Sequence, residues 1–183
     1  MVFVMLANGF EEVEAVSPVD VLRRAGVPVK TVAVENPSDY LVEGAHGIKV
    51  KADELLSNID ITDIDAIVLP GGMPGTKNLD ANDEVRAALS SCADNGKLIC
   101  AICAAPSVLG HLGLLSQKKA TCFPGFEREL GCGVFTGARV EVDGNVITAD
   151  GPGSAVLFGE AIATKFVGAD AAKRVVDSMK CRF

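Results

Sequence analysis

The sequence predicts an α/β fold in which a mostly parallel β-sheet lies between layers of helices. Continuous apolar runs, such as residues 2–6 and 98–102, are typical of strands that are covered on both faces. Segments with helical spacing alternate with these runs, which is the pattern of a parallel sheet with crossover helices. The chain has 183 residues, of which 49% are hydrophobic and 22% charged, so it can bury a core without disulfide bonds. We therefore expect a single domain spanning residues 1–183.

The first expected helix follows the strand at 2–6 and covers residues 11–26. It has acidic residues in its first turn, two arginines in its last turn and Gly26 as its stop signal. Pro18 lies inside this segment, and a proline within a helix predicts a kink or a division into two pieces.

Glu14 lies beside the apolar side of this helix. That side is formed by residues at spacings of three and four: Val13, Ala15, Val16 and Val19. The spacing leaves open whether Glu14 is solvated or drawn toward the sheet, where a carboxyl group must be paired or protonated. Glu11 and Glu12 have the ordinary explanation of acids at a helix N-terminus.

The next elements lead to a glycine turn and a capped helix. We expect, in order, a strand at 27–34, a turn at 36–39, an irregular hairpin over 41–52, a short helix at 53–59 and a strand from residue 65. That strand ends in Pro70-Gly71-Gly72, and glycine lets backbone N–H groups approach a ligand at the carboxyl edge of a sheet. A plain turn explains the same residues equally well. Asn82 then caps a helix over 83–94.

Cys103 stands at an abrupt turn between a buried strand, 98–102, and a helix that carries Pro106 in its first turn. A side chain on such an elbow is presented at the carboxyl edge of the sheet, where open α/β folds bind ligands. The start of a helix lowers the pKa of a thiol, so this position favours a nucleophilic thiolate. The alternative is a small buried cysteine that fits a tight turn.

The remaining expected elements are, in order, a short strand at 119–122, a helical turn at 126–130, a hairpin over 139–149, and helices at 154–167 and 169–179. Asp143-Gly144, at the turn of this hairpin, is the strongest local signal in the chain. Strands and helices therefore continue to alternate to the end of the sequence.

Composition and charge exclude several classes of protein. The chain has 17 basic and 24 acidic residues and a net charge of −7, which argues against nucleic acid as a main partner. There is no run of 18 or more apolar residues to span a membrane. Met1 leads directly into a strand without the basic segment of a secretion signal, so we expect a cytoplasmic protein.

Six cysteines in a chain without a secretion signal are expected to be free thiols. Cys100 and Cys103 form a C-x-x-C pattern, so a dithiol redox pair is an alternative, although Cys100 lies inside the expected strand. There is no second C-x-x-C and no spaced histidine pair, so we expect no metal ion and no cofactor. His46, in a loop between two glycines, is expected to be solvated or to contact a second subunit.

Five segments of the chain occur in an order that is typical of one protein family. They are Phe10-Glu11-Glu12-Val13-Glu14-Ala15, residues 18–26, Val68-Leu69-Pro70-Gly71-Gly72, Ala101-Ile102-Cys103-Ala104 and Asp150-Gly151-Pro152-Gly153-Ser154. Together they resemble the ThiJ/PfpI superfamily, in the branch of the Parkinson-disease protein DJ-1, nearly end to end. The resemblance implies a flavodoxin-like three-layer sandwich with a nucleophile elbow, a single domain similar to class I glutamine amidotransferases, and a homodimer.

The resemblance also implies roles for individual residues, carried over by motif. Cys103 would be the nucleophile, and Glu14 would be a buried carboxylic acid that is hydrogen-bonded to its sulfur. The backbone amides of Gly72 and Ala104 would form an oxyanion site, with Gly71 in the same turn.

Two positions depart from the pattern of the family. The protease-like branch has histidine directly after the elbow cysteine, where this chain has Ala104, so a Cys–His peptidase is not expected. His111 does not replace it, because eight residues of helix separate the two by roughly 12 Å.

Many relatives have a histidine where this chain has Phe123, so a polar pocket group is missing. Phe123 and Gly153 are expected to border the pocket, and His46 occupies an arginine position near the dimer interface.

The implied activity is that of a cysteine-dependent hydrolase or lyase acting on reactive carbonyls. Its substrates would be glycated proteins and nucleotides, for a deglycase, or small carbonyls, for a glutathione-independent glyoxalase. The Cys103 thiolate would add to the aldehyde, and Glu14 would transfer protons. The alternatives are a redox-sensing stress protein, in which Cys103 is oxidised, and a chaperone; neither requires turnover.

Overall fold

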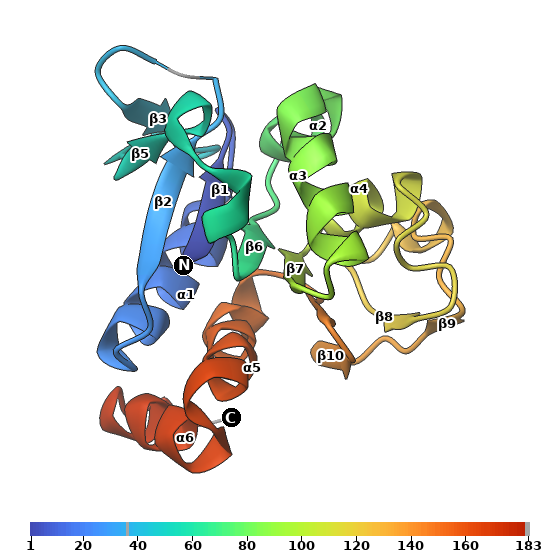
Figure 1. The fold of residues 1–183 in the computed structure, drawn as a ribbon. Coiled ribbons are helices and arrows are strands. Elements are labelled where there is room, and N and C mark those ends of the chain that lie inside the picture. Colours follow the sequence, from blue (N-terminus) through green and yellow to red (C-terminus); the bar gives the residue numbers. More distant parts are fainter. Residues whose placement is uncertain (36, 182–183) are drawn as a thin grey trace.

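A computed structural model describes residues 1–35 and 37–181, and its centre is a seven-stranded sheet (Figure 1). The strands are β1 (Val2–Leu6), β2 (Val29–Ala33), β5 (Glu54–Leu55), β6 (Ala66–Leu69), β7 (Leu98–Ile102), β10 (Val140–Asp143) and β11 (Val146–Ala149). They lie in the order β10-β11-β7-β6-β1-β2-β5, with β10–β11 antiparallel and the other pairs parallel. The segment β2-β1-β6-β7-β11 has the doubly wound order of flavodoxin-like folds, so the predicted fold class is confirmed.

Helices cover both faces of this sheet. On one face lie α1 (Glu12–Arg24), α5 (Ala155–Val167) and α6 (Ala169–Ser178), and on the other lie α2 (Gly75–Ala81), α3 (Asp83–Asp94) and α4 (Pro106–His111) (Figure 1). Successive residues of β1 point to opposite faces, so Val2 and Val4 pack in the α1 core, and Phe3 and Met5 in the α3 core. Within the described ranges, no helix is long and apolar enough to cross a membrane.

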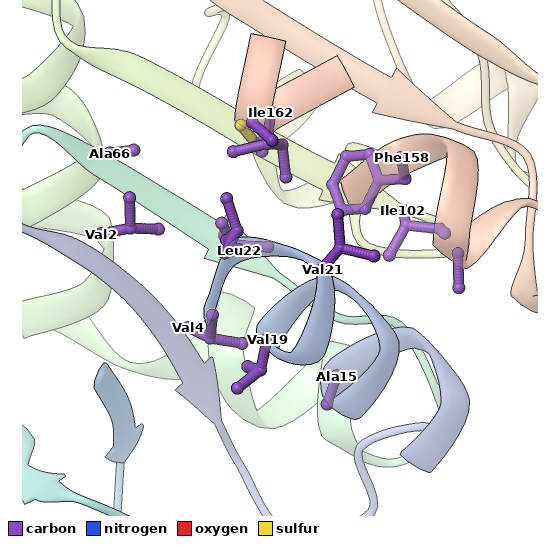
Figure 2. Packing of buried hydrophobic residues seen from close by; sticks show 14 of the residues in the cluster. Val2, Val4, Ala15, Val19, Val21, Leu22, Ala66, Ile102, Phe158 and Ile162 are labelled. Carbon is purple, nitrogen blue, oxygen red and sulfur yellow. The ribbon is translucent and has the colours of Figure 1, made fainter. Parts of the chain in front are cut away.

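The core between α1 and α5 fixes the position of α1 over the sheet. Figure 2 shows Val21 of α1 beside the ring of Phe158 on α5, and both side chains are fully buried. Complete burial of such a phenylalanine stabilises the fold by roughly 2–3 kcal/mol. Gly159 permits this close approach, because a Cβ there would lie 3.0 Å from Pro18 Cα and 3.1 Å from Val21 Cβ.

α1 differs from its prediction in two ways. It is one continuous helix, so the predicted division at Pro18 is wrong; the proline removes only the backbone hydrogen bond to the carbonyl of Glu14. Val13 and Val16 are each 49% exposed, so they do not form the buried face. The buried stripe instead contains Ala15, Pro18, Val19 and Leu22, and Glu14 lies next to it. The buried stripe has helical spacing, as predicted, but it is centred on a different side of the helix from the predicted one.

The segment at 53–59, predicted as a helix, is β5 followed by a 3₁₀ turn, Leu56–Asn58. Asp53 explains the difference, because its Oδ2 accepts hydrogen bonds from the amide and the hydroxyl of Thr31 on β2, both at 2.9 Å. These bonds align the chain beside β2 and favour strand pairing over the local helical preference.

Two small sheets and three further 3₁₀ turns complete the described fold. The predicted hairpin over 41–52 is present as the antiparallel pair β3 (Leu41–Glu43) and β4 (Lys49–Lys51). β8 (Lys119–Ala120) pairs with β9 (Val134–Phe135), and neither β9 nor α2 was predicted. The turns are Ile61–Asp63, Glu127–Glu129 and Pro152–Ser154. Residue 36, the first of the predicted turn at 36–39, lies outside the described residues.

Candidate active site

Three segments meet at the carboxyl edge of the sheet, where its strand order reverses. Glu14 follows β1 on α1, Gly71 and Gly72 follow β6, and Cys103 follows β7. Since β1, β6 and β7 are parallel neighbours, the segments after them emerge at the same edge. This is the position at which open α/β sheets bind their ligands.

Cys103 occupies a strained elbow that is held from both sides. Its backbone has φ = 66°, a left-handed conformation that costs a non-glycine residue about 1–3 kcal/mol. Its N–H donates to Ala149 O at the end of β11 (2.9 Å), and its carbonyl accepts the N–H of Phe123 (2.8 Å). These two hydrogen bonds fix the turn, and the side chain remains partly exposed.

Glu14 is fully buried next to this elbow, which resolves the alternative left open by its spacing. Its Oε2 accepts the N–H of Gly71 at 2.8 Å, and the Glu11 N–H donates to Gly71 O at 2.9 Å, so the first turn of α1 is joined to the loop after β6. The Cys103 thiol is a hydrogen-bonding neighbour of the carboxyl group. Oε1 is buried and has no well-aligned donor among the described residues.

The two acidic groups perturb each other. Burial raises the pKa of Glu14 to about 7, although hydrogen bonds from the Cys103 thiol and the Gly71 amide act to lower it. Burial and the adjacent Glu14 carboxyl raise the pKa of the Cys103 thiol, whereas the amides of Ala104 and Gly72 act to lower it. The predicted lowering of this thiol pKa is therefore wrong: α4 is only six residues long, and burial of the thiol together with the adjacent carboxyl group raises the pKa instead. The pair loses its first proton near pH 7 and holds its second strongly.

Gly71 and Gly72 are required by close contacts at the site. A Cβ on Gly71 would lie 2.7 Å from Glu14 Oε2 and 2.8 Å from Cys103 Cβ. Gly72 has φ = +90°, and a Cβ there would lie 2.4 Å from Glu11 N. Any larger residue at either position would separate the carboxyl group, the thiol and the loop that joins them.

The backbone amides at the site have different partners. Those of Gly72 and Ala104 are directed at the Cys103 sulfur, where they act to lower the pKa of the thiol. Their role as an oxyanion site for a substrate oxygen stays a prediction. The amide of Gly71 instead donates to Glu14, so this residue holds the acid and does not face the sulfur. The sequence does not distinguish these two roles, because nothing in Pro70-Gly71-Gly72 indicates which amide points toward Glu14 and which toward Cys103.

Phe123 and the turn at 151–153 flank the elbow on its other side. The ring of Phe123 is 43% exposed and lies against Gly151, where a Cβ would be 3.1 Å from its Cδ2. Gly153 faces open space, since a Cβ there would meet nothing within 4 Å. Arg139 fixes this turn by donating to Gly153 O (2.5 Å) and to Ser154 Oγ (3.2 Å). The sequence identified the glycines but gave no signal for the arginine, which belongs to the preceding hairpin.

His46 joins the β3–β4 hairpin to α1. Glu12 Oε1 accepts the N–H groups of His46 (2.8 Å) and Ile48 (3.3 Å), and Oε2 is 2.8 Å from His46 Nδ1. Burial acts to raise the pKa of Glu12, but these hydrogen bonds hold it below its ordinary value. The sequence assigned Glu12 only to the helix start and gave no signal for this link.

One group of described side chains has the composition of a metal site. Glu11, Glu12 and His46 place ligand atoms within 4.8 Å of one another. Their carboxylates are already hydrogen-bonded, since Glu11 Oε2 caps α1 by accepting the Glu14 N–H (2.7 Å) and Glu12 binds the hairpin. The group is therefore explained by the junction of α1 with the hairpin.

The six cysteines are free thiols, as predicted. Cys100 is fully buried in the α1 core, and burial raises its pKa well above the ordinary value. The first member of the C-x-x-C pattern is thus a packing residue, which argues against a dithiol redox site.

Comparison with known proteins assigns the chain to a family. The sequence profile of the DJ-1/PfpI family matches residues 1–165. The chain belongs to this family. A solved structure of oxidised DJ-1 from Toxoplasma gondii has a TM-score of 0.93 and 35% identity, covering 100% of this chain and 98% of that one. The DJ-1/PfpI fold thus extends over the whole chain.

Relatives in the DJ-1/PfpI family differ in length and in name. DJ-1 homolog B of Arabidopsis thaliana is 40% identical over 95% of this chain, which spans only 40% of the plant protein. The Parkinson disease protein 7 homolog of Danio rerio is 35% identical, covering 94% of this chain and 92% of the fish protein. YraA of Bacillus subtilis, provisionally named a cysteine protease, is 33% identical over 85% of this chain and 91% of its own length.

Proposed function

We propose that this protein is a cysteine-dependent enzyme acting on reactive carbonyls, as a glutathione-independent glyoxalase or a deglycase of glycated proteins and nucleotides. The observation that supports this most directly is the pairing of a buried carboxyl group, Glu14, with the thiol of the strained elbow residue Cys103. A carboxyl group with a pKa of about 7 accepts and returns protons near neutral pH, which is the requirement for general acid–base catalysis.

The proposed chemistry begins with the addition of sulfur to an aldehyde. The Cys103 sulfur forms a bond to the aldehyde carbon of a 2-oxoaldehyde while ionised Glu14 takes the thiol proton. The carbonyl electron pair moves to oxygen, where the amides of Gly72 and Ala104 stabilise the negative charge, and Glu14 returns the proton to give a hemithioacetal. Oε1 of Glu14, which has no well-aligned donor among the described residues, is the oxygen available for this exchange.

The remaining steps convert the hemithioacetal to a 2-hydroxy acid. Glu14 removes the proton from the sulfur-bearing carbon, the ketone oxygen is protonated to give an enediol, and reprotonation of the adjacent carbon gives a thioester. Water then cleaves the carbon–sulfur bond, releasing the acid and restoring the thiol. The sum is hydration and internal rearrangement of the 2-oxoaldehyde, with no external oxidant or reductant. In an early glycation adduct, a hemiaminal, the Cys103 sulfur would displace the amine: the carbon–sulfur bond forms, the carbon–nitrogen bond breaks, and Glu14 passes the thiol proton to the leaving nitrogen. The products are the same hemithioacetal and the free amine.

The test follows lactate formation from methylglyoxal without glutathione. Wild-type protein is compared with Cys103→Ser and Glu14→Gln, and the variants are checked for folding by circular dichroism. Turnover that both substitutions abolish supports the proposal, and full turnover by folded Cys103→Ser contradicts it. The glycated-lysine version of the assay, read as recovered amine, distinguishes deglycase from glyoxalase activity.

A redox sensor is a second candidate function, supported by the same carboxyl–thiol contact. Two equivalents of a peroxide would oxidise Cys103 to a sulfinic acid and form two water molecules, and protonated Glu14 would donate a hydrogen bond to the product. The related Toxoplasma gondii structure is described as oxidised. Intact mass after mild peroxide treatment tests this: two added oxygens on Cys103 support it, and equal oxidation of the six thiols contradicts it.

Peptidase activity, suggested by the name of YraA, is not supported by the histidines of this chain. His46 pairs with Glu12, and His111 Nδ1 lies 2.9 Å from Asp80 Oδ2. Neither histidine is hydrogen-bonded to Cys103 in the described structure, and Ala104 follows it in the chain. A thiol without an imidazole partner lacks the base of a Cys–His dyad.

We propose further that the protein is a homodimer that forms through α1 and the β3–β4 hairpin. Val13 and Val16 are each 49% exposed on α1, and Ile48 is 58% exposed on the hairpin. Glu12 joins the two elements, and in the proposed dimer these three apolar side chains would form part of the interface. Burial against a second copy would remove this surface from water.

A further inference from the structure

We propose that Phe123 makes the site selective for neutral 2-oxoaldehydes that carry an aromatic or bulky apolar substituent. This inference rests on the proposed glyoxalase activity and specifies its substrate class. It is carried by the backbone link between Phe123 and Cys103, by the exposed ring of Phe123, and by the negative charge of the acid–thiol pair.

Phe123 is tied directly to the nucleophile. Its N–H donates to the carbonyl of Cys103 at 2.8 Å, so the backbone of the aromatic residue moves with the elbow. Phe123 is 43% exposed, so part of its ring is available to a ligand that binds at the elbow. A flat apolar surface next to a nucleophile binds aromatic substituents by stacking or edge contacts.

The turn at 151–153 keeps the ring in place. Gly151 lies against one side of the ring, with its Cβ position 3.1 Å from Phe123 Cδ2. The turn is braced in two ways: Arg139 holds Gly153 O, and Ser154 Oγ donates to Asp150 Oδ1 at 2.5 Å. The contact with Gly151 covers one part of the ring and leaves the rest of it to face a substrate.

Charge disfavours anionic substrates at the same place. The pair of Glu14 and Cys103 carries one negative charge above about pH 7, because Glu14 has then lost its proton. The nearby guanidinium of Arg139 is engaged with Gly153 O and Ser154 Oγ, and the two histidines are paired with Glu12 and Asp80. A carboxylate or phosphate on the substrate would therefore meet the negative charge of the acid–thiol pair.

The experiment compares three 2-oxoaldehydes at pH 7.5 without glutathione: methylglyoxal, phenylglyoxal and 4-carboxyphenylglyoxal. The products are the corresponding 2-hydroxy acids, and kcat/KM is measured for each. Phe123→Ala removes the ring, and Phe123→Leu keeps apolar volume without aromaticity. Phe166→Ala is the matched control, because Phe166 is similarly exposed (39%) but lies near the far end of α5.

For each protein we divide kcat/KM for phenylglyoxal by kcat/KM for methylglyoxal. The decisive quantity is this selectivity ratio in a variant relative to the wild type, because the intrinsic reactivity of the two aldehydes then cancels. We expect this ratio to fall about tenfold in Phe123→Ala, partly in Phe123→Leu, and not at all in Phe166→Ala. We also expect the carboxylated substrate to react at least about tenfold more slowly than phenylglyoxal in the wild type. If the wild type turns over both substrates and the ratio is unchanged in Phe123→Ala, the proposed role of Phe123 in selectivity is wrong, while the proposed glyoxalase activity stands. Absence of turnover with every 2-oxoaldehyde overturns the proposed function as well.

Discussion

Replacing Glu14 by glutamine should remove a specific pH dependence from the stability of the protein. The carboxyl group is fully buried, and its pKa is raised from 4.5 to about 7 in the folded chain. Glutamine has the same shape and retains an oxygen to accept the Gly71 N–H, so it is a suitable neutral control. The difference between the two proteins therefore reports the ionisation of one group.

The sign and size of the effect follow from proton linkage. Below about pH 4.5 the carboxyl group is protonated in both the folded and the unfolded chain. Between pH 4.5 and 7 the unfolded chain has released the proton and the folded chain still holds it, so raising the pH favours unfolding. The rise in the pKa of Glu14 corresponds to about 3 kcal/mol in the free energy of unfolding. All of this stability is lost once the pH has risen through about 7.

Urea denaturation from pH 4 to pH 8.5 measures this directly. We expect the free energy of unfolding of the wild type to fall by about 3 kcal/mol relative to Glu14→Gln across that range. In Cys103→Ala, loss of the thiol hydrogen bond should raise the Glu14 pKa further, moving the midpoint of the loss to higher pH. Parallel pH curves for wild type and Glu14→Gln would refute the argument that Glu14 is protonated because it is buried.

Three further substitutions test the contacts around the site. Gly72→Ala should destabilise the fold by about 2 kcal/mol or more, because φ is +90° and the new Cβ would lie 2.4 Å from a backbone nitrogen; a thermal melt with unchanged Tm would contradict this. Val16→Asp should convert the proposed dimer to a monomer of 19.0 kDa in light scattering, whereas a wild type of that mass would remove the premise. Glu12→Ala should accelerate amide hydrogen exchange at His46 and Ile48 severalfold, since both amides lose their acceptor; equal protection in the variant would show that the hairpin is held by other contacts.

The elbow was predictable because its signals are adjacent in the sequence. The buried strand, Cys103 and Pro106 lie within nine residues, and each is recognisable without knowledge of distant contacts. The burial of Glu14 was not predictable in this way. Its partner, Gly71, is 57 residues away, and the position of the acid beside the apolar stripe of α1 is equally compatible with solvent. Only the resemblance to a family indicated that it faces the thiol.

Other features depend on tertiary contacts that leave no local pattern. Val13 and Val16 have helical spacing but face solvent, because the side of α1 that meets the sheet is set by Pro18 and Val21 against Gly159 of α5. The thiol pKa was predicted in the wrong direction for a related reason. The helix start is visible in the sequence, whereas the carboxyl group that opposes it arrives from another element.

The composition of the site has a consequence for the newly made chain. The acid is supplied by α1 and the thiol by the turn after β7, 89 positions apart in sequence, and the two meet only after β1, β6 and β7 have paired. Until then Cys103 is an ordinary thiol without the neighbouring carboxyl group or the Gly72 amide. The environment that distinguishes this cysteine from the other thiols therefore forms only when the sheet has formed, and a chain whose central strands separate loses it.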